Sequence, residues 1–219
     1  MRVLIVSDQI APQLYGDSIK INFSDVDLVL SCGDLPHYYL EYIVTMLNVP
    51  LYYVMGNHGF ELEYSDSGER RVRPEGCIDI NDRAVDSNGL RIAGLEGSLR
   101  YKDGPYQYTQ AQMRRKVIRL AMKLLGRQLR TGRRLDILLT HAPPFGIQDG
   151  KDLSHTGFRA FLQLLQWLRP RYLIHGHSHD YRRLQAETTV CRSTTVINVF
   201  PYRLLDIQPV QLHTEVSTR

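Results

Sequence analysis

Residue types that bind divalent metal ions recur along the chain, each time directly after a short apolar run. The set comprises Asp8, Asp34, Asn57, His58, His141, His177 and His179. Carboxylate oxygens and imidazole nitrogens together suit Mn, Fe or Zn better than Ca or Mg. No cysteine belongs to the set, which argues against a structural zinc site. The pattern therefore indicates a metal centre assembled from segments that are far apart in the sequence.

Short runs rich in Val, Ile and Leu precede these residues and must position them. The runs extend over Val3 to Val6, Leu28 to Leu30, Leu51 to Val54, Ile137 to Leu139 and Tyr172 to Ile174. Such runs are typical of strands buried on both faces. Helical patterns separate them, and the alternation of strand and helix predicts an α/β fold. The helical patterns cover about Tyr39 to Leu47, Gln110 to Leu129 and Phe158 to Leu168.

The carboxyl ends of the strands in an open α/β sheet face a common crevice, so we expect the polar residues to converge there. Glycines precede Asp34, Asn57 and His177, where the chain must turn tightly. Asn88-Gly89 between two apolar runs predicts a type I′ hairpin. Further β-like runs near the C-terminus predict antiparallel additions to the parallel part; they are Val196 to Phe200 and Leu204 to Ile207.

Each of these residues also has a purely structural interpretation. An Asp after a strand, such as Asp8 or Asp34, often only caps a helix. A lone histidine such as His141 is more often a hydrogen-bonded core or surface residue than a ligand. Five strand ends that all carry metal-binding residue types are, however, hard to explain by coincidence. The joint pattern therefore favours the metal centre.

In this order, the residues resemble the calcineurin-like metallophosphoesterases, in particular their small bacterial and archaeal single-domain members. The resemblance extends from Asp8 to His179, and its most specific part is the pairing of Gly56-Asn57-His58 with Gly176-His177-Ser178-His179. It implies an α/β fold in which a two-sheet β-sandwich is flanked by helices, in four αββα layers. It also implies a dinuclear metal site.

The resemblance further implies a role for each residue. The metal ligands would be Asp8, Asp34, Asn57, His141, His177 and His179. Asp34 would bridge two divalent ions (Mn, Fe or Zn), with Asp8 and His179 completing the first site and the other three ligands the second. His58 would bind no metal; it would stabilise the transferring phosphoryl group or protonate the leaving oxygen. Two cations about 3.5 to 4 Å apart activate a water as hydroxide for in-line attack, so the implied activity is phosphoester hydrolysis, with a phosphodiester favoured over a monoester.

Two positions depart from the family pattern. The family's first motif is Asp-x-His, but here Ile10 follows Asp8-Gln9 and removes one ligand of the first metal. That site is therefore expected to bind its ion more weakly. The family's third motif continues with an acidic residue that orients the catalytic histidine, whereas Gly59 follows His58 here. Glu61 or Glu63 is a candidate to take over this role from the following loop.

Several further residues are candidate substrate contacts. His155 lies shortly after the His141 segment, and His37 lies three residues after Asp34. Arg100 and Tyr101 follow a predicted strand. Each of these residues is equally well explained as a surface or helix-capping residue. The specificity loops carry no recognisable substrate motif, so the sequence indicates a small phosphoester or a nucleotide without naming it.

The helix predicted from Gln110 continues into a segment that is strongly basic up to Arg134 and contains no acidic residue. This face could attract nucleic acid, although a solvated helix face is the favoured interpretation because no interleaved aromatic residues accompany it. Two alternatives to the hydrolase therefore stay open. One is a metal-binding regulator or interaction module that has lost catalysis, and the other is a nuclease or nucleic-acid binder.

Length and composition bear on the number of domains and on membrane attachment. The chain has 219 residues, 43% of them hydrophobic, and a formal net charge of +4. This length supports one core of generous size, so we expect residues 1–219 to form a single domain. The first apolar run is too short for a signal peptide, and no run is long enough to span a membrane. We therefore expect a cytoplasmic protein without membrane attachment.

Overall fold

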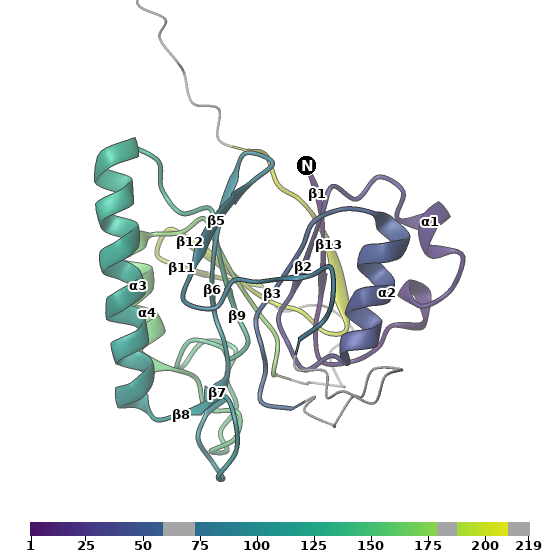
Figure 1. The fold of residues 1–219 in the computed structure, drawn as a ribbon. Helices are drawn as coiled ribbons and strands as arrows, with labels where there is room; N and C mark the ends of the chain where they lie inside the picture. Colours follow the sequence, from purple (N-terminus) through teal and green to yellow (C-terminus); the bar gives the residue numbers. More distant parts are fainter. Residues whose placement is uncertain (59–72, 179–187, 210–219) are drawn as a thin grey trace, which may run out of the picture.

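The computed structural model describes residues 1–58, 73–178 and 188–209. Two β-sheets face each other, and helices cover their outer faces (Figure 1). The five-stranded sheet has the order β13-β1-β2-β3-β4. Its strands are β1 (Arg2–Val6), β2 (Leu28–Ser31), β3 (Leu51–Tyr53), β4 (Ile78–Asp79) and β13 (Tyr202–Asp206).

The second sheet has six strands in the order β11-β12-β10-β9-β6-β5. Its strands are β5 (Ala84–Ser87), β6 (Leu90–Leu95), β9 (Ile137–Thr140), β10 (Tyr172–His175), β11 (Thr188–Cys191) and β12 (Thr194–Asn198). In both sheets the inner strands run parallel, and the antiparallel pairs involve the edge strands β13, β11 and β5. The expected antiparallel addition is confirmed for β13, whereas β12, predicted as another, runs parallel to β10 and pairs antiparallel only with β11.

The strands contribute apolar side chains to both of their faces, which explains their near-continuous hydrophobic sequences. In β1, Val3 and Ile5 belong to the core between the two sheets. The alternate residues Leu4 and Val6 belong to a second core beneath α1 (Ile19–Asn22) and α2 (His37–Leu47). A third core lies between the six-stranded sheet and its covering helices. Three apolar interfaces separate four layers, and the predicted αββα sandwich is confirmed.

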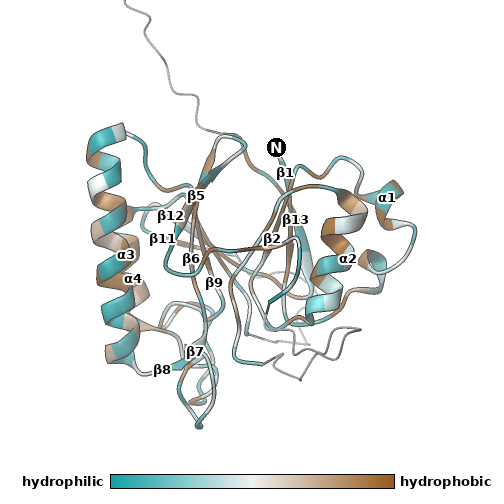
Figure 2. Cartoon of the chain, in the orientation of Figure 1, coloured by the Kyte–Doolittle hydropathy of each residue, from teal (hydrophilic) through white to brown (hydrophobic). Residues whose placement is uncertain are grey.

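Two helices cover the six-stranded sheet, α3 (Gln110–Thr131) and α4 (Arg159–Leu168). A capping box of Thr109 and Gln112 starts α3, and Gly132 ends it with a left-handed backbone (φ 66°). Both helices bury an apolar stripe against the sheet. Polar residues alternate with a few exposed apolar ones, such as Met122, along α3 (Figure 2). Among the described residues, no helix combines the length and the apolar character needed to cross a membrane.

The predicted turn between β5 and β6 has the expected geometry. Asn88 and Gly89 both have positive φ angles, 49° and 81°, as a type I′ turn requires. Some short elements carry no clear sequence signal. They are the 3-10 helix Pro12–Leu14, α1, β4, and the two-stranded sheet of β7 (Ser98–Leu99) and β8 (Gln107–Tyr108).

Candidate metal centre

The parallel strands of both sheets end at one edge of the sandwich, where the predicted ligands follow them. Backbone hydrogen bonds join these strand ends across the molecule. Asp8 N donates to Gly33 O (3.1 Å), and Gly176 N donates to His141 O (3.1 Å). The first bond links neighbouring segments of one sheet and the second links those of the other. The expected convergence at the strand ends therefore occurs.

Three side chains from β2, β3 and β9 meet at a common point. The Nε2 atom of His141 lies 3.0 Å from Oδ1 of Asn57 and 3.3 Å from Oδ2 of Asp34. His177, after β10, completes the group, since ligand atoms of Asp34, His141 and His177 all lie within 4.8 Å of one another. All four residues have little or no solvent exposure.

The separations between these atoms fit a bound divalent ion. Ligands about 2.1 Å from one ion, at right angles to each other, are about 3 Å apart. The distances from His141 Nε2 to Asn57 Oδ1 and to Asp34 Oδ2 are of this size. Two oxygen acceptors around one imidazole nitrogen also need a positive group between them. A proton on His141 supplies it here, and a metal ion can take the same place.

The protonation states of the two buried partners follow from this geometry. Burial lowers the pKa of His141, but the charge and hydrogen bond of Asp34 outweigh burial and raise the pKa to about 9. Burial raises the pKa of Asp34, but the charge and hydrogen bond of His141, together with the hydrogen bond from His58 N–H, outweigh burial and lower the pKa well below its ordinary range. His141 Nδ1 lies 2.8 Å from the carbonyl of Cys32 and donates to it, so Nε2 is the nitrogen that faces Asp34 and Asn57.

His177 is held in the neutral form with a defined tautomer. Its Nε2 lies 2.7 Å from the carbonyl oxygen of Ser154, which can only accept, so Nε2 carries the hydrogen. The lone pair is therefore on Nδ1. Burial, together with the charge of His141, lowers the pKa of His177 to about 3. A neutral imidazole with a fixed lone pair is the form that binds metal ions.

Asp8 lies beside this group, and its side chain contacts the backbone of His177. Its Oδ2 accepts hydrogen bonds from His177 N (3.0 Å) and from Ser7 Oγ. Asp8, Asp34 and His177 all have positive φ angles, 66°, 56° and 66°. Left-handed backbone costs about 1 to 3 kcal/mol at a non-glycine residue and persists where surrounding contacts enforce it, typically at functional sites. Among the described residues, three of the ten non-glycine residues with positive φ therefore lie together at this edge.

Two glycines make room for the carboxylates. A Cβ atom at position 56 would lie 2.5 Å from Cγ of Asp34, and one at position 176 would overlap Ser7 Oγ and Asp8 Oδ2. Only glycine therefore allows both carboxylates to lie against the neighbouring turns. The glycines preceding Asn57 and His177 serve this close approach in addition to any turn.

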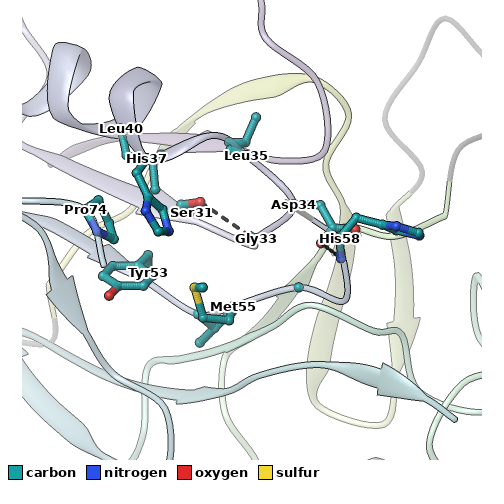
Figure 3. A pocket seen from close by; sticks show the side chains of 12 residues that line it. Ser31, Gly33, Asp34, Leu35, His37, Leu40, Tyr53, Met55, His58 and Pro74 are labelled. Carbon is teal, nitrogen blue, oxygen red and sulfur yellow. Dashed lines mark hydrogen bonds between the residues drawn. The ribbon is translucent and has the colours of Figure 1, made fainter. Parts of the chain in front are cut away.

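His58 lies at the solvent side of the group. Its backbone N–H donates to Oδ1 of Asp34 (2.7 Å), the oxygen not used by His141 (Figure 3). Its side chain is exposed, and Nε2 lies 3.3 Å from the hydroxyl of Tyr101. The same hydroxyl lies 3.4 Å from Nδ2 of Asn57. His58 therefore borders the site without joining the ligand group.

Three of the four predicted substrate contacts, His155, Arg100 and His37, have different surroundings. His155 lies close to the site, with its ring centroid 5.2 Å from that of His177 and its Nδ1 2.8 Å from Asp152. Arg100 donates from Nη2 to the carbonyl of Gln107 at 3.2 Å. His37 is only 5% exposed and lies on the Pro74 side of a small pocket, away from His58 (Figure 3). His155 is thus the one of the three that adjoins the ligand group.

Some predicted residues cannot be placed. His179, Gly59, Glu61 and Glu63 lie outside the described residues. Ile10 packs against the core beneath α1 and α2. Of the residues expected to bind the first metal ion, Asp8 and Asp34 are therefore the ones that the structure describes.

Contacts made by three groups were not anticipated as parts of the site. The carbonyls of Cys32 and Ser154 orient the two ligand histidines, and sequence carries no signal for such contacts. The Tyr101 hydroxyl joins Asn57 to His58, although its position after a strand had marked it only as a candidate substrate contact. Hydrogen bonds of this kind to the side chains of the site depend on loop geometry, which residue types alone do not specify.

The basic residues of α3 divide into two groups. Lys116 and Arg127 form ion pairs with acidic residues of the sheet side, Asp82, Glu96 and Asp86. Arg114 and Arg115 of α3, together with Arg159 of α4, instead line a groove of about 610 Å³ between the two helices. No acidic residue lines this groove among the described residues.

The fold is of the α/β class, and residues of types that bind metal ions cluster at the ends of its strands. Residues 1–181 match the model of the family described as calcineurin-like phosphoesterase, and the chain belongs to that family. No curated protein matches the chain significantly. The resemblance read from the sequence is thereby confirmed.

Two solved structures agree with this fold. One crystal structure matches with a TM-score of 0.63 and 15% identity over 94% of both chains. That of the protein TT1561 of Thermus thermophilus matches with a TM-score of 0.56 and 14% identity, over 90% of this chain and 88% of that one. A more distant match is Vps29 from Chaetomium thermophilum, with a TM-score of 0.40 and 15% identity over 94% of this chain and 85% of that one.

Proposed function

We propose that this protein is a metal-dependent phosphoesterase, acting as a single domain of residues 1–219 on a phosphodiester in preference to a monoester. The observation that carries the proposal is the convergence of Asp34, His141 and His177 within 4.8 Å, with Asn57 Oδ1 beside them. Membership of the calcineurin-like phosphoesterase family supports a phosphoester as the substrate class. A small phosphoester or a nucleotide is the proposed substrate.

The ligand roles follow from the donors and their orientation. Asp34, Asn57, His141 and His177 would hold one divalent ion of Mn, Fe or Zn, and Asp34 would share a second, more weakly held ion with Asp8 and His179. Bound there, the ions would supply Lewis acidity toward the phosphoryl oxygens and lower the pKa of a bound water. The carbonyls of Cys32 and Ser154 keep a lone pair of each ligand histidine directed at the site.

His58 is the proposed residue for proton transfer. Its side chain is exposed, so a substrate can reach the imidazole, while its backbone is fixed by Asp34. From this place the imidazole can stabilise a phosphoryl oxygen or donate a proton to the leaving oxygen. The buried ligand histidines cannot do this because they do not face solvent.

The test combines metal loading with turnover. Protein incubated with manganese is freed of excess metal, its metal content is measured by elemental analysis, and hydrolysis of bis(4-nitrophenyl) phosphate is followed. We expect bound manganese and turnover, with both lost in Asp34→Asn and only turnover lost in His58→Ala. The control Asp17→Asn removes the same kind of charge at an exposed position elsewhere. Absence of turnover in the loaded wild-type protein contradicts the proposal.

A second candidate function is a metal-binding regulator or interaction module without catalysis. It is favoured by one observation: Ile10 offers no donor and packs into the core. If the first site stays empty for this reason, the protein would bind one ion tightly. Metal binding at one equivalent without hydrolysis of mono- or diesters would support this candidate over the hydrolase.

Nucleic acid is a third candidate ligand, supported by the groove of Arg114, Arg115 and Arg159. Cations without acidic neighbours in a groove can bind phosphates, and such binding weakens steeply with salt. Salt-dependent retention of DNA or RNA that is reduced in a variant with Arg114→Glu, Arg115→Glu and Arg159→Glu would favour this candidate. Retention that does not change in the variant would exclude the groove.

A further inference from the structure

Tyr101 is anchored in a fixed position beside the metal-ligand group. It lies in the segment between β7 and β8, where one buried side chain, Gln107, organises the loop. Oε1 of Gln107 accepts hydrogen bonds from the backbone N–H groups of Tyr101 and Lys102, each at 3.2 Å. Gln107 itself is 3% exposed. The place of Tyr101 is therefore set by a buried contact rather than by solvent.

The hydroxyl of Tyr101 contacts two neighbouring residues of the site. Asn57 Nδ2 donates to it at 3.4 Å, and His58 Nε2 lies 3.3 Å from it. Asn57 belongs to the ligand group, and His58 is the proposed proton donor. One oxygen atom thus joins the metal-binding part of the site to its proton-transfer part.

The contact with Asn57 fixes which end of the amide faces the metal position. Asn57 Oδ1 lies 3.0 Å from Nε2 of His141, on the side of the ligand group. Its Nδ2 faces the hydroxyl of Tyr101 on the other side. An amide rotated by half a turn would direct its NH₂ group at the ligand position, where it could not bind a cation. Tyr101 opposes that rotation because its oxygen accepts a hydrogen bond from Nδ2.

The contact with His58 fills a role that the sequence leaves vacant. Gly59 stands where a carboxylate could have oriented the imidazole. Within residues 1–58, 73–178 and 188–209, no ion pair of His58 with a carboxylate is found, and its ring hydrogen bond goes to Tyr101. A phenol both donates and accepts, so it can keep this bond whether or not Nε2 carries a hydrogen. A carboxylate could only accept.

We propose that Tyr101 is a positioning residue that orients the imidazole of His58 and the amide of Asn57. The expected effect on kcat rests on the proposed phosphoesterase function. The expected orientation of the two side chains does not depend on it. The hydroxyl holds Nε2 beside Asn57 and thereby orients the ring, which leaves Nδ1 as the ring nitrogen available to a leaving oxygen. Tyr101 acts through His58 and Asn57.

The kinetic test uses Tyr101→Phe, which removes only the hydroxyl. With bis(4-nitrophenyl) phosphate and manganese, we expect kcat to fall about ten-fold or more, as is usual when a supporting hydrogen bond is lost, while KM changes little. The matched control is Tyr38→Phe, which removes a phenolic hydroxyl from a side chain that is 44% exposed on α2. An unchanged kcat in Tyr101→Phe would overturn the proposal.

A second readout does not need turnover. Long-range ¹H–¹⁵N spectra of the metal-free protein report the histidine ring nitrogens, and the His58 signals are identified by their loss in His58→Ala. In Tyr101→Phe we expect the His58 ring signals and the Asn57 side-chain amide signals to shift. In Tyr38→Phe they should stay in place. Unchanged His58 and Asn57 signals in Tyr101→Phe contradict the proposal even if the wild-type protein hydrolyses no ester, an outcome that separately contradicts the proposed function.

A variant pair at Gln107 tests the anchoring. Gln107→Glu keeps an acceptor for the two backbone N–H groups, whereas Gln107→Leu removes it. We expect the His58 signals to shift in Gln107→Leu and to stay near their wild-type positions in Gln107→Glu. We likewise expect kcat to fall in Gln107→Leu and to stay near the wild-type value in Gln107→Glu. Equal signals in both Gln107 variants and the wild type would show that Tyr101 keeps its place without this anchor, and would overturn that part of the inference.

Discussion

The backbone N–H of His177 donates a hydrogen bond to Oδ2 of Asp8 at 3.0 Å, and the two residues are 169 positions apart in the sequence. Asp8 follows β1 of the five-stranded sheet, and His177 follows β10 of the six-stranded sheet. The bond therefore joins the ends of the two sheets at the edge where the ligand group lies.

Gly176 is the residue that lets the two strand ends approach. We expect Gly176→Ala to lower the free energy of unfolding by about 2 kcal/mol, because its Cβ would overlap Ser7 Oγ and Asp8 Oδ2 and force the strand ends apart. Urea unfolding of the metal-free protein measures this change. The control is Gly126→Ala inside α3, where no atom lies within 4 Å of the added Cβ. We expect that substitution to stabilise by about 0.5 to 1 kcal/mol. Equal effects of the two substitutions would contradict the close approach at Gly176.

The stability of the metal-free protein should fall as the pH rises from about 6.5 to about 9. The pKa of His141 is raised from 6.5 to about 9 by the charge and hydrogen bond of Asp34, which outweigh burial. A raised folded-state pKa adds stability that is complete below the unfolded-state pKa and is lost as the pH passes the folded-state pKa. At about 1.4 kcal/mol per pKa unit, the loss is on the order of 3 kcal/mol.

The titration of two other buried histidines does not contribute to the change in stability between pH 6.5 and pH 9. His175 and His177 have pKa values lowered by burial to about 4 and about 3, so their contribution to stability is lost only as the pH falls below about 6.5. Urea unfolding between pH 6 and pH 9.5 tests the prediction. In Asp34→Asn the charge that raises the pKa of His141 is gone, and the decline should be much smaller. A wild-type stability that stays level to pH 9.5 would show that His141 is neutral at pH 7.

The strand ends could be predicted because their signal is local. Each buried run is apolar at every position, and each ends in a residue such as Asp34 or His141 that an apolar strand would not otherwise contain. Once the α/β class is known, the common edge follows from the parallel arrangement. Helix α3 was similarly clear, since its apolar stripe and its capping residue Thr109 are both readable.

The contacts around the ligands could not be predicted because they involve carbonyls and loop conformations. Any residue at position 154 would offer the same carbonyl to His177, so its identity carries no signal. The first two residues of α2 were missed because His37 and Tyr38 follow Pro36 without a side-chain cap. Tyr101 reaches His58 only through the short pairing of β7 and β8, in which two residues on each strand take part.

Metal binding should release a proton from His141. The metal and the proton compete for Nε2, and at pH 7 a pKa of about 9 means that the proton is present. Asp34 releases none, because the charge and hydrogen bond of His141 and the hydrogen bond from His58 N–H together outweigh burial and lower the pKa of that carboxyl far below neutral. Titration calorimetry with manganese at pH 7, in two buffers of different protonation enthalpy, should show about one proton released for the ion bound at this group.

The same competition predicts that metal affinity rises about ten-fold per pH unit below pH 9 and levels off above it. Asp17→Asn, at an exposed position, is the control and should leave both proton release and affinity unchanged. Metal binding without proton release would mean that the ion does not displace the hydrogen between His141 and Asp34. The ligand group would then have to be placed elsewhere.

Lys116 shows that part of the basic charge of α3 is structural. Its Nζ lies 2.9 Å from Asp82 and 3.3 Å from Glu96, and Glu96 is only 6% exposed. We expect Lys116→Leu to lower the free energy of unfolding by about 3 kcal/mol, because it leaves the buried Glu96 carboxylate without its cation. Lys123→Leu, on an exposed part of the same helix, should change it by less than about 0.5 kcal/mol. Urea unfolding compares the two, and an equal effect would show that Lys116 is as dispensable as a solvated lysine.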